Sequence, residues 1–197
     1  METLLSICVG IGLSAACGFR VFVPLFVMSV ASHAGHLTLS PPFEWIGTYP
    51  ALIAFAIATC VEIAGYYVPW VDNLLDTIAT PAAIVAGIIV MASTVYGMTP
   101  FLKWALAIIA GGGVAATVQV ATGVARGAAA VTTAGVGNPF VATMEVGGAI
   151  TLSLLASGLP VLAGLVVLGL LGFAAKKVLE RQRRYSPHVP ASEESGR

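Results

Sequence analysis

The chain has 197 residues, of which 58% are hydrophobic and only 9% are charged, and its formal net charge is zero. A soluble domain carries about 25% charged residues, so this chain cannot cover itself with a polar surface, which excludes a water-soluble enzyme. The one local group of basic residues is too small to indicate a nucleic-acid partner.

Turn signals divide the apolar sequence into six segments close to the length of about 20 residues that a membrane-spanning helix needs. We therefore expect an all-α membrane protein with transmembrane helices over residues 4–31, 49–68, 81–97, 101–122, 139–157 and 159–175. The first helix is interrupted near its middle by Gly18, Arg20 and Pro24. Residues 1–175 form one transmembrane domain on this prediction.

Two segments between these helices have patterns of their own. Residues 70–79 place Trp70 and Leu74 on one face and Asp72 and Asp76 on the other, which is typical of a short helix lying along the membrane surface. Residues 123–138 are rich in Gly, Ala and Thr, and we expect a loop or a partly re-entrant hairpin there, with Arg126 at the surface.

A basic cluster follows the last apolar segment and sets the expected orientation. Residues 176–197 are first basic and then polar, which predicts a disordered tail. Because basic flanks stay in the cytoplasm, this tail is expected to be cytoplasmic, and an even number of spans then places the N-terminus in the cytoplasm too.

The two halves of the chain resemble each other in outline. Residues 12–16 are similar to residues 113–117, Glu62 and Glu145 each lie in the second helix of a half, and Pro81 and Pro160 each open the third. Three spans per half is an odd number, so a duplicated unit would be inverted relative to its partner. The pattern predicts two inverted three-helix repeats, the plan of many secondary transporters.

Apart from Lys103, which lies at the start of residues 101–122, three charged residues fall inside the predicted membrane helices: Arg20, Glu62 and Glu145. A charge in hydrocarbon costs at least about 2.5–3.5 kcal/mol, so each one needs a partner or a watery cavity. One hypothesis is a substrate-binding site formed by all three near the bilayer midplane. The alternatives are a structural ion pair between Arg20 and Glu62, or side chains that extend to the head groups.

Other polar residues suggest weaker sites. Asp72, Asn73 and Asp76 could hold a cation, although such a set is more often the solvated face of an interfacial helix. His33 and His36 could bind a metal or respond to pH, but two histidines alone are a weak signal. We expect no metal, cofactor or catalytic residue, because no set of residues has the spacing that an enzyme requires.

Four segments together resemble one known family: Gly12-Leu-Ser-Ala-Ala-Cys-Gly-Phe-Arg-Val-Phe-Val-Pro24, Pro42-Phe-Glu-Trp45, Val68-Pro-Trp-Val-Asp-Asn-Leu-Leu-Asp76 and Gly137-Asn-Pro139. The family consists of small bacterial membrane proteins and is catalogued as a domain of unknown function. The resemblance implies a multi-pass bacterial membrane protein. The apolar helices and the basic flank predict a location in the inner membrane, with the lipid bilayer as a partner. The resemblance implies no activity or substrate.

Two functions are compatible with these patterns. The first is a small transporter or channel for an ion, a small anionic or zwitterionic solute or a lipid head group. The alternative is a non-transporting scaffold that associates through glycine-rich helix faces, with a homo-oligomer as one outcome, and recruits a cytoplasmic partner.

Overall fold

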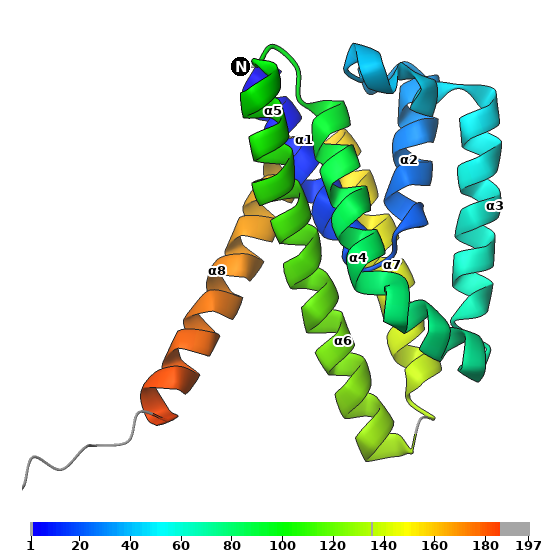
Figure 1. The fold of residues 1–197 in the computed structure, drawn as a ribbon, viewed down its shortest axis with the longest axis vertical. Coiled ribbons are helices and arrows are strands. Elements are labelled where there is room, and N and C mark those ends of the chain that lie inside the picture. The colour runs from blue at the N-terminus through cyan, green and yellow to red at the C-terminus, as the bar shows by residue number, and fades with distance from the viewer. Residues whose placement is uncertain (1, 135, 186–197) are drawn as a thin grey trace, which may run out of the picture.

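The computed structural model describes residues 2–134 and 136–185, and every regular element in these ranges is a helix. The elements in chain order (Figure 1) are α1 Glu2–Cys17, α2 Phe22–His33, the 3₁₀-helix η1 Pro41–Gly47, α3 Tyr49–Gly65, α4 Pro69–Thr94, α5 Pro100–Leu106, the π-helical segment η2 Ala107–Gly112, α6 Gly113–Thr133, α7 Asn138–Gly158 and α8 Pro160–Tyr185. Residues 186–197 of the predicted tail lie outside the described residues.

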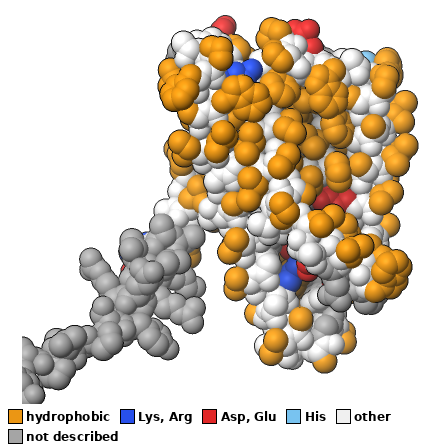
Figure 2. Space-filling model, viewed as in Figure 1, with side chains coloured by type: hydrophobic (Ala, Val, Ile, Leu, Met, Phe, Trp, Pro, Cys, Tyr) orange, Lys and Arg blue, Asp and Glu red, His pale blue; other side chains and the backbone are white. Residues whose placement is uncertain are grey.

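Several helices are long and apolar enough to cross a membrane. Three candidate spans lie within the described residues: Trp70–Thr94, Pro100–Thr133 and Asn138–Gly158. A fourth is possible if η1 and α3, which meet at 65°, count as one bent span. Figure 2 shows hydrophobic side chains over most of one face of the bundle. These helices indicate a membrane protein, but they do not confirm six spans.

The predicted first span is two helices that run in opposite directions (Figure 1). α1 ends at Cys17, α2 begins at Phe22, and each is shorter than a usual span. Because the chain turns back at this break, the start of α1 and the end of α8 lie at opposite ends of the bundle. The predicted position of both termini in the cytoplasm stays a prediction.

Residues 70–79 are not a separate surface helix. They are the first part of α4, a single helix over Pro69–Thr94 with Pro81 inside it. Proline removes one helical hydrogen bond and can bend a helix without ending it. Pro81 was therefore wrongly interpreted as the start of a new helix. This continuity brings Asp72 and Asp76 into the bundle.

Two further boundaries differ from the prediction. The segment 123–138, expected as a loop or re-entrant hairpin, is helical as far as Thr133, the last residue of α6. α8 continues to Tyr185, ten residues beyond the expected end at residue 175, so part of the predicted disordered tail is helical. Gly and Ala lower the hydropathy of α6 without preventing a helix, which explains the first difference.

The helix directions agree only in part with an inverted repeat. α3 and α7, which carry the two matched glutamates, run in opposite directions in Figure 1, as inversion requires. α1 and α6, which carry the matched Gly-Ala segments, run in the same direction. Pro160 opens α8, whereas Pro81 lies inside α4. The structure does not confirm the predicted repeat.

The bundle is held together by close helix contacts around α1, which packs on α4, α7 and α8. α4 also meets η2 at what we call the glycine seam, formed by Gly87 and Gly111. A Cβ built on Gly87 would lie 2.6 Å from the Gly111 carbonyl oxygen, and one on Gly111 would lie 2.5 Å from the Gly87 oxygen. Ser14 Oγ of α1 donates to the same Gly87 oxygen at 3.0 Å. Only glycine allows this approach of two backbones.

Candidate functional site

Arg20 lies in the break between α1 and α2. A Cβ on the neighbouring Gly18 would be 2.6 Å from the carbonyl oxygen of Ala115, so glycine lets the break pack directly against α6. Arg20 itself is 1% exposed. Its Nη2 donates to the Ala142 carbonyl oxygen at 3.1 Å and forms an ion pair with Glu145 Oε2 at 3.1 Å. The break therefore places a buried cation against α7.

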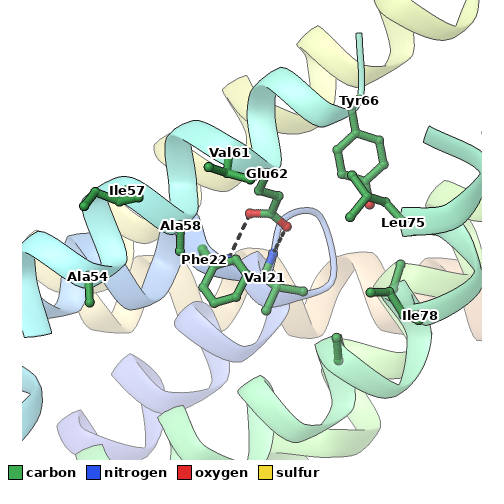
Figure 3. A pocket seen from close by; sticks show the side chains of 12 residues that line it. Val21, Phe22, Ala54, Ile57, Ala58, Val61, Glu62, Tyr66, Leu75 and Ile78 are labelled. Carbon is green, nitrogen blue, oxygen red and sulfur yellow. Dashed lines mark hydrogen bonds between the residues drawn. The ribbon is translucent and has the colours of Figure 1, made fainter. Parts of the chain in front are cut away.

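Glu62 does not form the expected ion pair with Arg20. Its carboxylate accepts hydrogen bonds from the backbone N–H groups of Val21, at 2.7 Å, and Phe22, at 3.0 Å. Figure 3 shows both bonds joining the start of α2 to α3. A helix N-terminus carries unsatisfied donors and a partial positive charge, so Glu62 satisfies the start of α2 from a neighbouring helix. Glu62 thus stabilises the break beside Arg20.

Arg126 is buried, which corrects its predicted place at the surface. It is 7% exposed because α6 continues through this position and carries the side chain into the bundle. Its Nε donates to Glu145 Oε1 at 2.8 Å, and its Nη2 pairs with Glu145 Oε2. Two arginines from separate elements therefore share one carboxylate on α7.

The two aspartates of α4 complete this network. Arg126 Nη1 pairs with Asp72 Oδ1 at 3.2 Å and with Asp76 Oδ1 at 2.6 Å. The side chain of Asp72 is 9% exposed and that of Asp76 is 39% exposed, so these residues are not simply the solvated face of an interfacial helix. The cation that they contact is a guanidinium. The side chain of Asn73 lies outside those that the structure describes.

We call Arg20, Asp72, Asp76, Arg126 and Glu145 the charge cluster, since ion pairs link all five. It contains three carboxylates and two guanidinium groups, so its formal charge is −1 when every group is ionised. Removing one partner from such a buried set leaves an uncompensated charge, at a cost of about 3–5 kcal/mol. Glu62 lies beside the cluster and adds a fourth carboxylate.

Tyr66 also belongs to this site. The Cζ atoms of Arg20 and Arg126 lie 3.6 Å and 4.2 Å from its ring centroid. Guanidinium groups are attracted to the electron-rich face of an aromatic ring, most strongly where water is excluded. The only signal in the sequence was the spacing of four residues from Glu62, which places both side chains on one face of α3.

Two members of the charge cluster, and Glu62 beside it, lie at the ends of helices. Arg20 follows the end of α1, Glu62 lies in the last turn of α3, and Asp72 lies in the first turn of α4. α6 and α7 extend further and cover these helix ends (Figure 1). Helix ends offer backbone donors and acceptors to charged groups, which explains why the charges collect there.

Two nitrogens of Arg20 have no hydrogen-bond partner among the described residues. Nε and Nη1 are both buried. A guanidinium has five N–H donors, and buried donors in native proteins are normally satisfied by protein or by ordered water. This part of the cluster therefore has unused capacity for a polar atom.

The histidines lie apart from the cluster. His33 Nδ1 is 3.0 Å from the Gly47 carbonyl oxygen and its ring packs edge-on against Tyr49, while His36 is exposed. In the described part of the chain, no group of three or more His, Cys, Asp or Glu side chains is arranged to hold a metal ion. The structure gives the two histidines no common partner that would make them a ligand pair.

A groove lies between α3 and α4 on the outer side of Glu62. Its volume is about 490 Å³, within the range of small-molecule pockets. Figure 3 shows Glu62 and Tyr66 together at one part of its wall, with apolar side chains around the rest. The bundle thus presents a carboxylate to an otherwise apolar recess.

Comparison with known proteins identifies a family and no activity. A family model described as "Domain of unknown function (DUF4126)" matches residues 7–179. No curated protein and no solved structure matches the chain. The match covers most of the length, including every residue of the charge cluster, and the chain therefore belongs to the DUF4126 family.

Proposed function

We propose that this protein is a small membrane transporter, not an enzyme, in which the charge cluster takes up and releases a proton during transport. The observation that carries this proposal is the charge imbalance: ion pairs join three carboxylates to two guanidinium groups, and four of these five side chains are at most 9% exposed. Ionisable groups in membrane segments are costly, and they commonly mark ion pathways or proton relays.

The arrangement favours a cation over the anionic or zwitterionic solute that Arg20 alone had suggested. Glu145 already pairs with both arginines, and Arg126 also binds the two aspartates. An anion would have to displace these carboxylates. A proton needs no displacement, since it can bind a carboxylate that is already present.

Asp76 provides the proposed point of entry. Its side chain is the most exposed of the cluster, whereas Arg20 at the other end is fully enclosed. Arg126 and Glu145 connect these two residues through continuous ion pairs. The proposed relay carries the proton between carboxylates, from Asp76 beside the water to Glu145, while both guanidinium groups stay protonated.

We propose a location in the bacterial cytoplasmic membrane, with the basic end of α8 in the cytoplasm. Basic flanks are retained on that side of the membrane. Since α1 begins at the opposite end of the bundle, the N-terminus is proposed to face outward. Cysteine labelling at the two ends of the chain in intact cells would test this orientation.

Proton flux in liposomes tests the function. Vesicles containing a pH-sensitive dye would receive a membrane potential from a potassium gradient and valinomycin. We expect wild-type protein to acidify the lumen, Asp76→Asn to reduce the rate about tenfold or more, and Glu145→Gln to abolish it. Glu44→Gln, a change at an exposed carboxylate of η1, is the control and should retain the wild-type rate.

The outcome that contradicts the proposal is equally specific. Asp76 is half-exposed, so its variant should fold even if Glu145→Gln does not. Equal proton flux through wild type and folded Asp76→Asn would show that the charge cluster is not part of the proton pathway. A complete lack of flux through folded wild type would favour the second candidate function.

That second candidate is a scaffold, and outward-facing glycines favour it. Among the described residues, no atom of another helix lies within 4 Å of a Cβ added to Gly113, Gly123, Gly127 or Gly147. Small residues on a lipid-facing surface allow another helix to approach. Cross-linking in membranes, compared between wild type and Gly127→Leu, would show whether these faces hold copies of the chain together.

A further inference from the structure

The groove between α3 and α4 suggests a second site, distinct from the charge cluster. Ala58 and Val61 line it from α3, Ala79 and Ala82 from α4, and Phe22 from the start of α2. The groove is long enough to reach from Ala54 to Tyr66 along α3. Because α2 closes its inner side, the recess is a bounded site and not a gap between two helices.

The groove opens toward the apolar exterior of the bundle. Ile57, Val61 and Ile78 line it and are 60%, 65% and 52% exposed. Large aliphatic side chains at that exposure face lipid in a membrane protein. A ligand would therefore enter from the bilayer and must itself be largely hydrophobic.

One lining residue carries a formal charge, and that residue is Glu62. Its two backbone donors occupy one acceptor position on each carboxylate oxygen, and each oxygen has a second lone pair. The adjacent charge cluster is itself negative by one unit when ionised, because its two arginines are outnumbered by three carboxylates. The groove is therefore complementary to a positive charge on an apolar body.

We propose that this groove binds a lipophilic cation, an amine or onium compound whose apolar groups fill the space between α3 and α4 while its charge rests against Glu62. A neutral acyl chain would fill the same space but would leave the carboxylate facing hydrocarbon, which is unfavourable. The proposal rests on the groove and Glu62, and does not require the charge cluster to conduct protons.

Binding of tetraphenylphosphonium to the purified full-length protein in detergent tests the proposal. Isothermal titration calorimetry should detect binding to wild type, and Glu62→Gln should weaken it by about tenfold or more, because a desolvated charge pair is lost. Glu44→Gln removes an exposed carboxylate that does not line the groove, and this variant should bind as wild type does. Equal affinity of folded Glu62→Gln and wild type would overturn the proposal.

Two further variants keep the test valid if Glu62→Gln fails to fold: one fills the groove and the other is its control. Ala58→Phe places a ring in the groove, whereas Ala64→Phe places one on an exposed position of the same helix outside it. We expect only Ala58→Phe to reduce binding, again by about tenfold or more. Unchanged binding in both variants would show that the cation binds elsewhere.

The neutral analogue triphenylphosphine tests whether the groove recognises positive charge or only apolar surface. It should bind at least about tenfold more weakly than tetraphenylphosphonium if Glu62 acts as the counter-ion. Equal binding of the two compounds would mean that the groove accepts any apolar molecule, lipid tails included, and would overturn the proposal. Proton flux without cation binding would contradict the proposed cation site and leave the transport function standing. Cation binding without proton flux would contradict the transport function and leave the cation site standing.

Discussion

α4 is joined to the rod formed by α5, η2 and α6 at two places, and the two contacts use opposite chemistry. At the glycine seam, Gly87 and Gly111 bring two backbones together with no room for a side chain. In the charge cluster, Arg126 reaches from α6 to Asp72 and Asp76 on α4. Figure 1 shows the two helices diverging toward the second contact. The first contact depends mainly on the small size of glycine, and the second depends mainly on charge.

This difference shows how a bundle of apolar helices can be closely packed in one place and sensitive to protonation in another. Backbone contact at the seam has no titratable group and no long side chain, so neither pH nor salt should alter it. The ion pairs of the cluster depend on which carboxylates are ionised and can be exchanged one for another. The seam therefore fixes the position of α4, and the cluster is the part whose state can change.

Removing the central cation should have the largest effect. Arg126→Gln leaves Asp72, Asp76 and Glu145 without their shared partner, and we expect the free energy of unfolding to fall by about 3–5 kcal/mol. Reversible denaturation by dodecyl sulfate in mixed micelles, followed by circular dichroism, measures this change.

The control for that prediction is Lys103→Gln. Lys103 donates to Ser40 Oγ at 2.7 Å and lies outside the cluster, so its loss should cost about 1–2 kcal/mol. Similar losses in the two variants would show that the carboxylates of the cluster do not depend on Arg126.

Overpacking the glycine seam should have an intermediate effect. The methyl group of Gly111→Ala would collide with the Gly87 carbonyl oxygen, and we expect a loss of about 1–3 kcal/mol in the same denaturation measurement. Gly113→Ala, two residues further on, meets open space and should stay within about 0.5 kcal/mol of wild type. An equal, small change in the free energy of unfolding for Gly111→Ala and Gly113→Ala would mean that the two backbones at the seam are less closely packed than their distances imply.

The smallest effect concerns the hydrogen bond at the seam. Ser14→Ala removes the bond from Ser14 Oγ to the Gly87 oxygen and should lower the free energy of unfolding by about 1 kcal/mol. Thr117→Ala removes a hydroxyl whose hydrogen bond, among the described residues, is to the Gly113 carbonyl oxygen of its own helix, and it should change stability by less than about 0.5 kcal/mol. If both changes were neutral, the seam would be purely a contact of backbones.

The candidate site was predicted in part. Arg20, Glu62 and Glu145 stand out in the sequence because a charge among apolar residues needs a partner. Their pairing could not be read from it: Arg20 pairs with Glu145, and Glu62 binds the backbone of the next helix. Arg126 was misplaced because its small, weakly hydrophobic neighbours resemble a loop as much as a helix.

The sequence by itself determined the helical membrane class, the interruption near Arg20 and the presence of charges that apolar surroundings must accommodate. These follow from composition and local spacing, which depend on near neighbours in the chain. Only the tertiary structure decided that residues 70–79 continue into α4, that α1 and α2 turn back on each other, and that five charged side chains meet. Ion pairs depend on distances between atoms from remote segments, and no pattern along the chain specifies those distances.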